Sequence, residues 1–339
     1  MPFNADLKNI EIHNHLDGSV RPQTIWELSQ KKKVNLNFTT FDEFHQTLLP
    51  KQPYTLTNYL KGYDLIVPVI AGDKEALARI STECVEDCAT RGKLFYVELR
   101  FAPHLLTGPG LDAEAVTKTV LDAVNRAGKQ NGLEVRLILC MMRHKPDTAN
   151  DIVQLAVNFK PHGVVGVDLA GDDRGWKGTS PKIIEAFQSA KKLGIHRTVH
   201  AGENGPAEAV IEAIEEMHAE RIGHGYHILD KPELYEIVRQ RNVHFEVCPT
   251  SSLRTGAVTL TNGRKHPVVQ FAEDKIPFSI NTDGHTMTES WVPQELEFCV
   301  KKLGLSSQAV KQSKYNLKDG IFLDGEEKTE IINHLLQVA

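Results

Sequence analysis

The stretch Glu11-Ile-His-Asn-His-Leu-Asp-Gly-Ser19 is the part of the sequence from which the fold can best be predicted. Its two histidines, His13 and His15, follow a β-prone run and stand two residues apart. Alternate residues of a strand face the same side roughly 6–7 Å apart, so two neutral imidazoles placed in this way can share one metal ion. Asp17 and Gly18 then break the strand and leave the pair at its C-terminal end. A lone His-x-His motif is equally compatible with chance, and a metal site is favoured only because other strands end in similar residues.

Eight short apolar runs recur along the chain, separated by longer segments with helical periodicity. Several runs lack strict alternation of apolar and polar residues, as expected for strands that are buried on both faces. Strands that are each followed by a helix predict an α/β fold, the (β/α)8 TIM barrel, here as a single domain over residues 1–339. The predicted strands span residues 10–13, 94–100, 135–141, 164–170, 197–201, 221–224, 243–248 and 277–281.

Segments with apolar residues at i, i+3 and i+4 are predicted to be helices. The insertion after the first strand, residues 20–92, is expected to hold extra helices that cover the barrel mouth, and the C-terminal region is expected to add helices after the last strand. The predicted helices span residues 73–91, 113–131, 151–158, 182–193, 207–218, 234–240, 293–303, 306–316 and 326–336.

Composition and charge narrow the class of protein and its partners. The 339 residues are 41% hydrophobic and 24% charged, which is typical of a soluble globular protein. The net charge is −5, and the densest basic run, Lys31–Lys33, is interpreted as a solvated helix end. Neither nucleic acid nor a membrane is therefore expected as a partner, and no obligate protein partner is evident. Five cysteines without a CxxC motif, together with the lack of a signal peptide, predict a cytoplasmic protein with free thiols.

Acid, base and metal-type residues stand at the ends of the predicted strands, where the active site of such a barrel is built. A catalytic zinc takes three or more nitrogen or oxygen ligands and leaves a position for water, whose pKa it lowers toward neutrality. Glu203, three residues beyond one candidate ligand, is expected to transfer protons without binding the metal. His224, set between two glycines, is expected to orient the water or stabilise its developing charge. The natural ligand set for one zinc per chain is His13, His15, His200 and Asp283.

Other histidines and one cysteine receive less specific interpretations. His196 and His244 come early in their strands, at the end of the barrel that serves stability, and are predicted to be structural. His104 and His144 come at the barrel mouth, where lining a pocket and simple packing are equally plausible. Cys248 follows a buried run and is predicted to be an inert thiol, because a nucleophilic cysteine needs a neighbouring base.

Six short motifs together resemble the adenosine deaminase family of the metal-dependent hydrolase barrels. They occur in the family's order from about residue 9 to residue 285, and the set is far more specific than any one motif. The motifs are His13-Asn-His-Leu-Asp-Gly-Ser19, Val167-Asp-Leu-Ala-Gly-Asp172, Thr198-Val-His-Ala-Gly-Glu203, Arg221-Ile-Gly-His-Gly-Tyr-His227, Cys248-Pro-Thr-Ser251 and Asn281-Thr-Asp283.

The resemblance implies a role for each matching residue, including zinc binding by the four ligands already named. Glu203 would protonate the purine at N1 while hydroxide attacks C6, and His224 and Asp283 would hold and deprotonate the water. The backbone of Gly171 would meet purine N3, and Asp17 the sugar hydroxyl. The family carries a hydrophobic gate helix over the pocket, which matches residues 56–63 here, although core packing explains any one of these side chains equally well. The implied substrate-binding set is His15, Asp17, Leu56, Tyr59, Tyr63, Gly171 and Gly284.

Two positions depart from the family pattern. Gly284 stands where many members carry a second aspartate that contacts purine N7, and Ala102 stands where some relatives carry serine near the sugar. Because glycine offers N7 no side chain, water or His285 would have to make that contact, and recognition of N7 is expected to be looser. These departures affect the choice of substrate more than the reaction.

The sequence therefore predicts an enzyme that converts adenosine and 2′-deoxyadenosine to inosine and 2′-deoxyinosine with release of ammonia. The alternative is a deaminase of another 6-aminopurine compound: adenine, methylthioadenosine or an N6-substituted AMP. A binuclear amidohydrolase is disfavoured because the fourth predicted strand lacks a bridging lysine, and a nucleic acid deaminase because no P-C-x-x-C motif is present. A nucleoside-binding protein without catalysis is disfavoured because all four ligands and Glu203 are in place.

Overall fold

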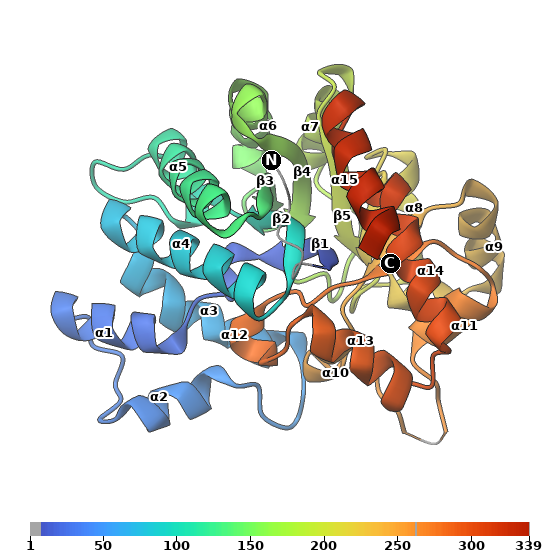
Figure 1. Cartoon of the computed structure of the whole chain (residues 1–339), viewed down its shortest axis with the longest axis horizontal. Coiled ribbons are helices and arrows are strands. Elements are labelled where there is room, and N and C mark those ends of the chain that lie inside the picture. The colour runs from blue at the N-terminus through green and yellow to red at the C-terminus, as the bar shows by residue number, and fades with distance from the viewer. Residues whose placement is uncertain (1–7, 262, 339) are drawn as a thin grey trace.

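Eight parallel strands form one barrel in the computed structural model, which describes residues 8–261 and 263–338. The strands pair in their order along the chain, so each neighbour in the sheet is also the next strand in sequence. In Figure 1 they lie at the centre of the molecule with helices around them, and the predicted TIM barrel is confirmed. The strands are β1 (Asn9–His15), β2 (Leu94–Phe101), β3 (Glu134–Met142), β4 (Val164–Ala170), β5 (His196–Ala201), β6 (Arg221–His224), β7 (His244–Val247) and β8 (Phe278–Ile280).

The barrel closes where the segment after β8 meets the end of β1. Asn14 and Asp283 form an isolated parallel bridge. The His15 N–H donates to the Asp283 carbonyl at 2.6 Å, and the Asp283 N–H donates to the His13 carbonyl at 3.1 Å. This seam is therefore made by the same short segments that carry three of the four predicted metal ligands.

Helices connect successive strands and continue beyond the last one. Sequence periodicity did not predict α10, α11 and α12, because helices of four to seven residues are too short to show it. The other barrel helices agree with the predicted segments to within a few residues at each end. The helices are α1 (Pro22–Lys32), α2 (Phe41–Leu48), α3 (Leu56–Ile70), α4 (Lys74–Thr90), α5 (Ala113–Asn131), α6 (Ala149–Phe159), α7 (Pro181–Lys192), α8 (Ala207–Glu215), α9 (Pro232–Arg241), α10 (Pro249–Arg254), α11 (Pro267–Glu273), α12 (His285–Thr288), α13 (Val292–Lys301), α14 (Ser307–Gly320) and α15 (Gly325–Val338).

The insertion between β1 and β2 holds α1 to α4, as predicted from the length of the segment. α3 begins after the N-cap residue Thr55, whose hydroxyl accepts the Asn58 N–H at 3.2 Å. Such a cap satisfies one of the free N–H groups at a helix start and contributes about 1 kcal/mol. The helix then presents residues of its first two turns to the barrel mouth, where they form one wall of the cavity described below.

A small apolar core fastens the C-terminal helices against the beginnings of β1 and β2. Two histidines predicted to be structural lie near these helices. The His196 ring stacks on Phe322 with 4.7 Å between centroids, and His244 Nε2 lies 3.0 Å from the Ser279 hydroxyl. Each fully buried apolar side chain contributes about 1.5–3 kcal/mol. The core consists of Ile10, Ile12, Phe95, Tyr96, Leu317, Ile321, Leu323, Ile331 and Leu335.

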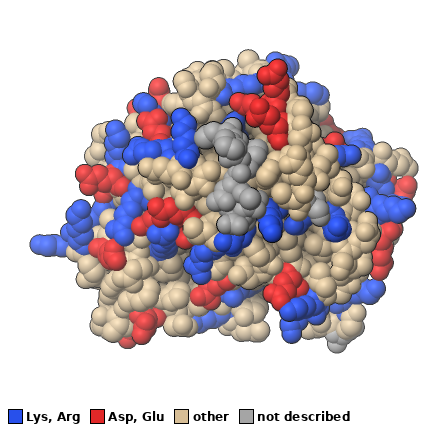
Figure 2. Space-filling view, viewed as in Figure 1, with Lys and Arg blue, Asp and Glu red and all other residues tan. Residues whose placement is uncertain are grey.

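One face of the molecule can be examined for patches of charge in Figure 2. On the side shown in Figure 2, basic and acidic residues are interspersed rather than gathered into a patch of one sign. Among the described residues, no helix is both long and apolar enough to cross a bilayer. All five cysteines are buried and free.

Candidate active site and metal centre

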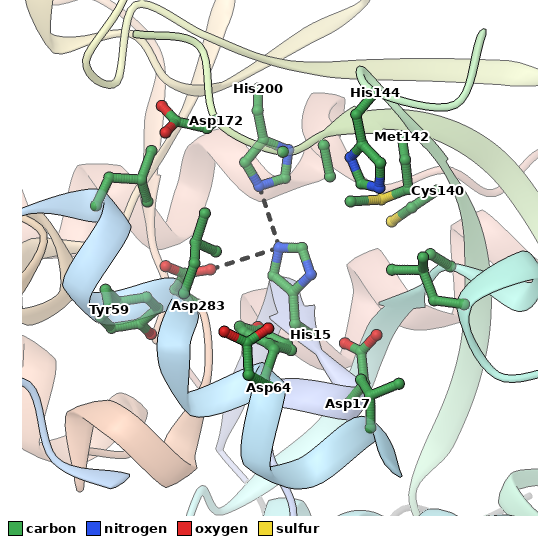
Figure 3. A pocket seen from close by; sticks show the side chains of 18 of the residues that line it. His15, Asp17, Tyr59, Asp64, Cys140, Met142, His144, Asp172, His200 and Asp283 are labelled. Carbon is green, nitrogen blue, oxygen red and sulfur yellow. Dashed lines mark hydrogen bonds and ion pairs between the residues drawn. The ribbon is translucent and has the colours of Figure 1, made fainter. Parts of the chain in front are cut away.

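A cavity of about 480 Å³ opens at the C-terminal ends of the strands, against α3. Its volume lies within the range of small-molecule sites, roughly 300–1,000 Å³. Figure 3 shows side chains from several strand ends and from α3 converging on this space. The predicted site residues that line it are His15, Asp17, Leu56, Tyr59, Tyr63, Gly171, His200, Glu203, His224 and Asp283.

The four predicted metal ligands come together at the base of the cavity. One possible ligand atom from each of His13, His15, His200 and Asp283 lies within 4.8 Å of the others. His15 Nε2 is 3.1 Å from His200 Nε2, as the dashed line in Figure 3 marks. Asp283 Oδ1 lies 3.4 Å from Nε2 of His13 and 3.5 Å from Nε2 of His15. The buried His13 Nε2 makes no hydrogen bond to another described residue. Three imidazole nitrogens and a carboxylate oxygen that converge in this way suit a divalent cation such as zinc.

Two buried carboxylates orient the histidine ligands. Glu246 on β7 lies 2.6 Å from His13 Nδ1, and Asp168 on β4 lies 3.0 Å from His200 Nδ1. Burial alone would raise the pKa of both carboxyls, but nearby cations hold each pKa well below its ordinary value. An ionised carboxylate accepts the Nδ1–H of its histidine, which leaves the Nε2 lone pair directed at the metal position.

The cations include two arginines that lie buried inside the barrel. Arg100 donates to Glu246 at 2.8 Å and to Asp168 at 3.2 Å. Arg221 donates to Glu246 at 2.6 Å and to Glu98 at 2.7 Å. Sequence reasoning missed this network as a functional feature. The sequence did contain a signal, because these charged residues stand within strands that are mostly apolar. Charged side chains are almost never fully buried unless they are paired, so their positions indicated ion pairs inside the barrel.

Glu203 lies on the cavity wall, on the loop after β5. Burial raises its pKa well above 4.5, and the negative charges of Asp173 and Asp283 raise it further, which favours the protonated form of the carboxyl. The Asp173 carboxylate also fixes the loop, accepting the N–H of Glu203 at 3.2 Å and the N–H of Asn204 at 3.0 Å. Asp173 was not anticipated from the sequence, because it belongs to a different loop, after β4.

Backbone strain marks two of the site residues. His224 and Asp283 have positive φ angles of 66° and 70°, a conformation that costs a non-glycine residue about 1–3 kcal/mol and clusters at functional sites. His224 Nε2 lies 3.8 Å from Glu203 Oε2. Burial lowers the pKa of His224 well below 6.5, so the imidazole is neutral, which is the form that can accept a proton.

Other lining residues are those predicted to hold the substrate. Asp17 Oδ1 is buried without a hydrogen bond from another described residue, and burial raises the pKa of Asp17 to about 7. Gly171 has a φ of +104°, where a side chain would be strained. His144 lines the cavity, whereas His104 borders a separate surface hollow. The apolar or aromatic residues that α3 contributes include Leu56, Tyr59, Leu60 and Tyr63.

Gly284 and His285 are not among the residues that line the cavity. A Cβ added to Gly284 would lie 2.8 Å from the carbonyl oxygen of Gly18, closer than Cβ atoms come to such an oxygen. A side chain at this position would therefore displace backbone instead of reaching the substrate freely. His285, the suggested substitute for the N7 contact, is buried with its Nε2 2.9 Å from Asn14 Nδ2. The partner of N7 must be sought elsewhere in the lining.

A second buried group, Glu11, Cys88 and His285, also has its possible ligand atoms within 4.8 Å of one another. Both oxygens of Glu11 and the Nε2 atom of His285 already have hydrogen-bond partners. Glu11 accepts the Thr282 N–H at 2.7 Å on one oxygen and the Asn14 amide at 3.0 Å on the other. Since the same Asn14 amide meets His285, this group is largely satisfied without a metal, and the prediction of one zinc refers to the cluster around His13.

Comparison with known proteins identifies relatives of the whole chain. A family model described as adenosine deaminase matches residues 9–338. A curated relative from Gallus gallus, named adenosine deaminase, is 40% identical over 97% of this chain and 94% of its own length. The solved N6-mAMP deaminase of Arabidopsis superposes with a TM-score of 0.84 at 26% identity over 98% of both chains. The adenine deaminase of Arthrobacter aurescens superposes with a TM-score of 0.86 over 98% of this chain and 99% of that one, but at 23% identity it shows the shared fold alone.

Proposed function

The chain belongs to the adenosine deaminase family, and on this premise we propose that it deaminates adenosine and 2′-deoxyadenosine hydrolytically with one bound zinc ion. The products are inosine and 2′-deoxyinosine, with ammonia released. One observation carries the proposal: four metal ligands converge at a cavity that three of them line together with Glu203, and the volume of this cavity suits a nucleoside.

Each residue of the site has a distinct role in the proposed reaction. His13, His15, His200 and Asp283 would hold the zinc ion, which when bound would make a water molecule nucleophilic near neutral pH. Glu203, kept protonated by burial, donates its proton to purine N1 as C6 is attacked. The neutral His224, which lies 3.8 Å from Glu203, orients the attacking water and accepts its proton. Each proton transfer of this kind contributes about 10²–10⁴-fold to the rate.

The charges around the cavity favour a nucleoside over a nucleotide. Among the described residues no lysine or arginine lines it, so a 5′-phosphate would find no basic side chain there as a counterion. The free Oδ1 of Asp17 offers an acceptor to a sugar hydroxyl, which adenine lacks. These features favour adenosine over an N6-substituted AMP and over adenine, although an Arabidopsis neighbour is an N6-mAMP deaminase. The acidic and ionisable lining residues are Asp17, Asp64, Asp172, Glu203 and Asp283.

The proposal is tested by the loss of absorbance near the adenine band across a panel of 6-aminopurines. The panel contains adenosine, 2′-deoxyadenosine, adenine, methylthioadenosine and N6-methyl-AMP, and zinc is quantified in the same sample. We expect the highest kcat/KM with the two nucleosides. A higher kcat/KM with adenine or N6-methyl-AMP would replace the proposed substrate, and no turnover by fully metallated protein would remove the proposed reaction.

The proposed location is the cytoplasm. All five thiols are free and buried, which is the state expected in a reducing compartment.

A further inference from the structure

Tyr59, one of the residues that line the cavity, has a buried hydroxyl without a hydrogen bond of normal geometry to a described residue. Tyr59 lies in the first turns of α3, is only 3% exposed and lines the cavity. Its Oη has no hydrogen bond of normal geometry to another described residue. A buried donor that lacks a partner costs about 1–3 kcal/mol, and most buried polar groups avoid this cost by pairing. The hydroxyl is therefore placed to be satisfied by the substrate.

The neighbours of this hydroxyl place it on the β8 side of the cavity. Figure 3 shows Tyr59 beside Asp283. Ser251 interacts with the Tyr59 hydroxyl and donates its own proton to Asp283 Oδ2. Burial and the charge of Asp283 raise the pKa of Tyr59 well above 10, so the phenol keeps its proton and acts as a donor.

The proposed roles of Glu203 and Gly171 orient the purine. Glu203 follows β5 and meets N1, and Gly171 follows β4 and meets N3, so the six-membered ring faces that half of the barrel. C6 stands between N1 and the five-membered ring. With C6 at the metal cluster, N7 points away from Glu203, toward the end of β8 and the start of α3. This is the region that holds Asp283 and Tyr59.

The described residue directly after the ligand Asp283 offers N7 no side chain. Gly284 has none, and a Cβ on it would press on the Gly18 carbonyl. N7 is a pure acceptor in a buried site, and it needs a donor. We propose that the Tyr59 hydroxyl donates a hydrogen bond to purine N7 and makes this tyrosine a specificity-determining residue. The inference rests on the proposed function, and it replaces the expectation that N7 is loosely recognised.

The test compares adenosine with 7-deazaadenosine, in which a C–H group replaces N7. In the unaltered protein the deaza compound is expected to lose about 5- to 150-fold in kcat/KM, the range that corresponds to an unpaired buried donor. In Tyr59→Phe, kcat/KM for adenosine falls by a similar factor while that for 7-deazaadenosine changes little. The two substrates should therefore have nearly equal kcat/KM values in this variant. If the deaza compound is not turned over, the two purines are compared through competitive inhibition constants of the corresponding 6-oxo products.

Tyr63→Phe is the matched control. Tyr63 lies one turn later on α3 and also lines the cavity, but its hydroxyl lies against Gly18, where an added Cβ would come within 2.4 Å of it. Whatever its effect on the individual rates, this variant is expected to leave the ratio of kcat/KM for the two substrates unchanged. If adenosine and 7-deazaadenosine have nearly equal kcat/KM values in both variants, the packing of α3 against the substrate, and not a hydrogen bond, sets the preference for adenosine.

Three results would overturn the inference: no deaza penalty in the unaltered protein, a penalty that survives in Tyr59→Phe, or its loss in both variants. The first measurement does not depend on any variant. If Tyr59→Phe does not fold, as judged by circular dichroism and metal content, Tyr59→Leu removes the same hydroxyl. Failure of the proposed function is distinguishable, because it would appear as a lack of adenosine turnover before any comparison is made.

Discussion

Replacing Glu246 with glutamine should loosen the metal centre without touching a metal ligand. Glu246 accepts hydrogen bonds from His13 Nδ1 at 2.6 Å, Arg100 at 2.8 Å and Arg221 at 2.6 Å. Glutamine keeps the shape of the side chain but replaces one acceptor oxygen with an NH₂ donor. That donor must face groups that are themselves donors, so at least one of these bonds is lost and His13 is no longer held in one tautomer.

The expected magnitudes follow from the partners that remain. Removing a carboxylate that orients a metal-ligating histidine typically lowers metal affinity about 10- to 100-fold. Breaking a buried ion pair costs about 3–5 kcal/mol of folding free energy. Here Arg100 keeps Asp168 at 3.2 Å and Arg221 keeps Glu98 at 2.7 Å. Because both arginines keep a carboxylate partner, we expect the folding free energy to fall by about 3 kcal/mol, the lower end of that range.

Competition with a zinc chelator measures the affinity, and urea unfolding of metal-free protein measures the stability. Glu98→Gln is the matched control. Glu98 is equally buried and pairs with the same Arg221, and its other partners are the Tyr96 hydroxyl at 2.9 Å and the Phe322 N–H at 2.6 Å. This control should lose comparable stability and keep the metal affinity.

Two results would refute the assignment of Glu246 to the metal centre. One is an unchanged zinc affinity in Glu246→Gln. The other is an equal loss of affinity in Glu98→Gln, which would show that zinc binding responds to general weakening of the barrel and not to the orientation of His13.

Three further predictions concern the proton donor, the metal and a buried carboxyl. Glu203→Gln should keep the fold and the zinc while kcat/KM for adenosine falls by about 10²–10⁴-fold; near-normal turnover would remove its assigned role. Prolonged dialysis against a strong chelator should remove one equivalent of zinc together with the activity, and added zinc should restore both; two catalytic equivalents by elemental analysis would contradict the mononuclear site. Glu295 on α13 accepts the Thr250 N–H at 3.1 Å, and burial raises its pKa from 4.5 to about 7. The folded state therefore keeps this proton between pH 4.5 and 7 while the unfolded state releases it, so stability falls as pH rises through this window, by up to about 3 kcal/mol. Glu295→Gln should flatten that part of the urea-unfolding profile, and a profile parallel to that of the parent would disprove the linkage.

The sequence predicted the strands well because they are short apolar runs that end in chemically distinctive residues. Since parallel strands of a barrel point the same way, His13, His200 and Asp283 could be placed at one end of it without any knowledge of distances. Glu203 was identified for the same reason, by its position just beyond a strand. The predicted role of each of these residues depends on where a strand ends. The end of a strand can be located from the local sequence, without knowledge of the tertiary structure.

Features that depend on which side chains meet inside the barrel could not be predicted. Glu246 and Arg221 belong to neighbouring strands, but their pairing with Glu98 and Arg100 across the interior requires the radius and tilt of the barrel. Gly284 looked like a substrate contact because it follows a metal ligand, yet the direction of its absent Cβ runs into Gly18. The helices α10 to α12 were missed because tertiary contacts, and not periodicity, stabilise such short segments.

Closure of the barrel at the metal ligands has a consequence for how the protein is synthesised. The Ile12 N–H bonds to the side chain of Asn281, 269 residues later in the chain, and Asp283 follows two residues after that. At about 5–20 residues per second, a ribosome needs on the order of tens of seconds to make the intervening chain. During that interval β1 can pair with β2 on one side only, and its other edge is open to wrong pairing. Because the four proposed ligands assemble only when that edge is covered, a nascent chain is not expected to hold the proposed zinc ion tightly, and the metal content of a preparation should measure the fraction of molecules whose barrels have closed.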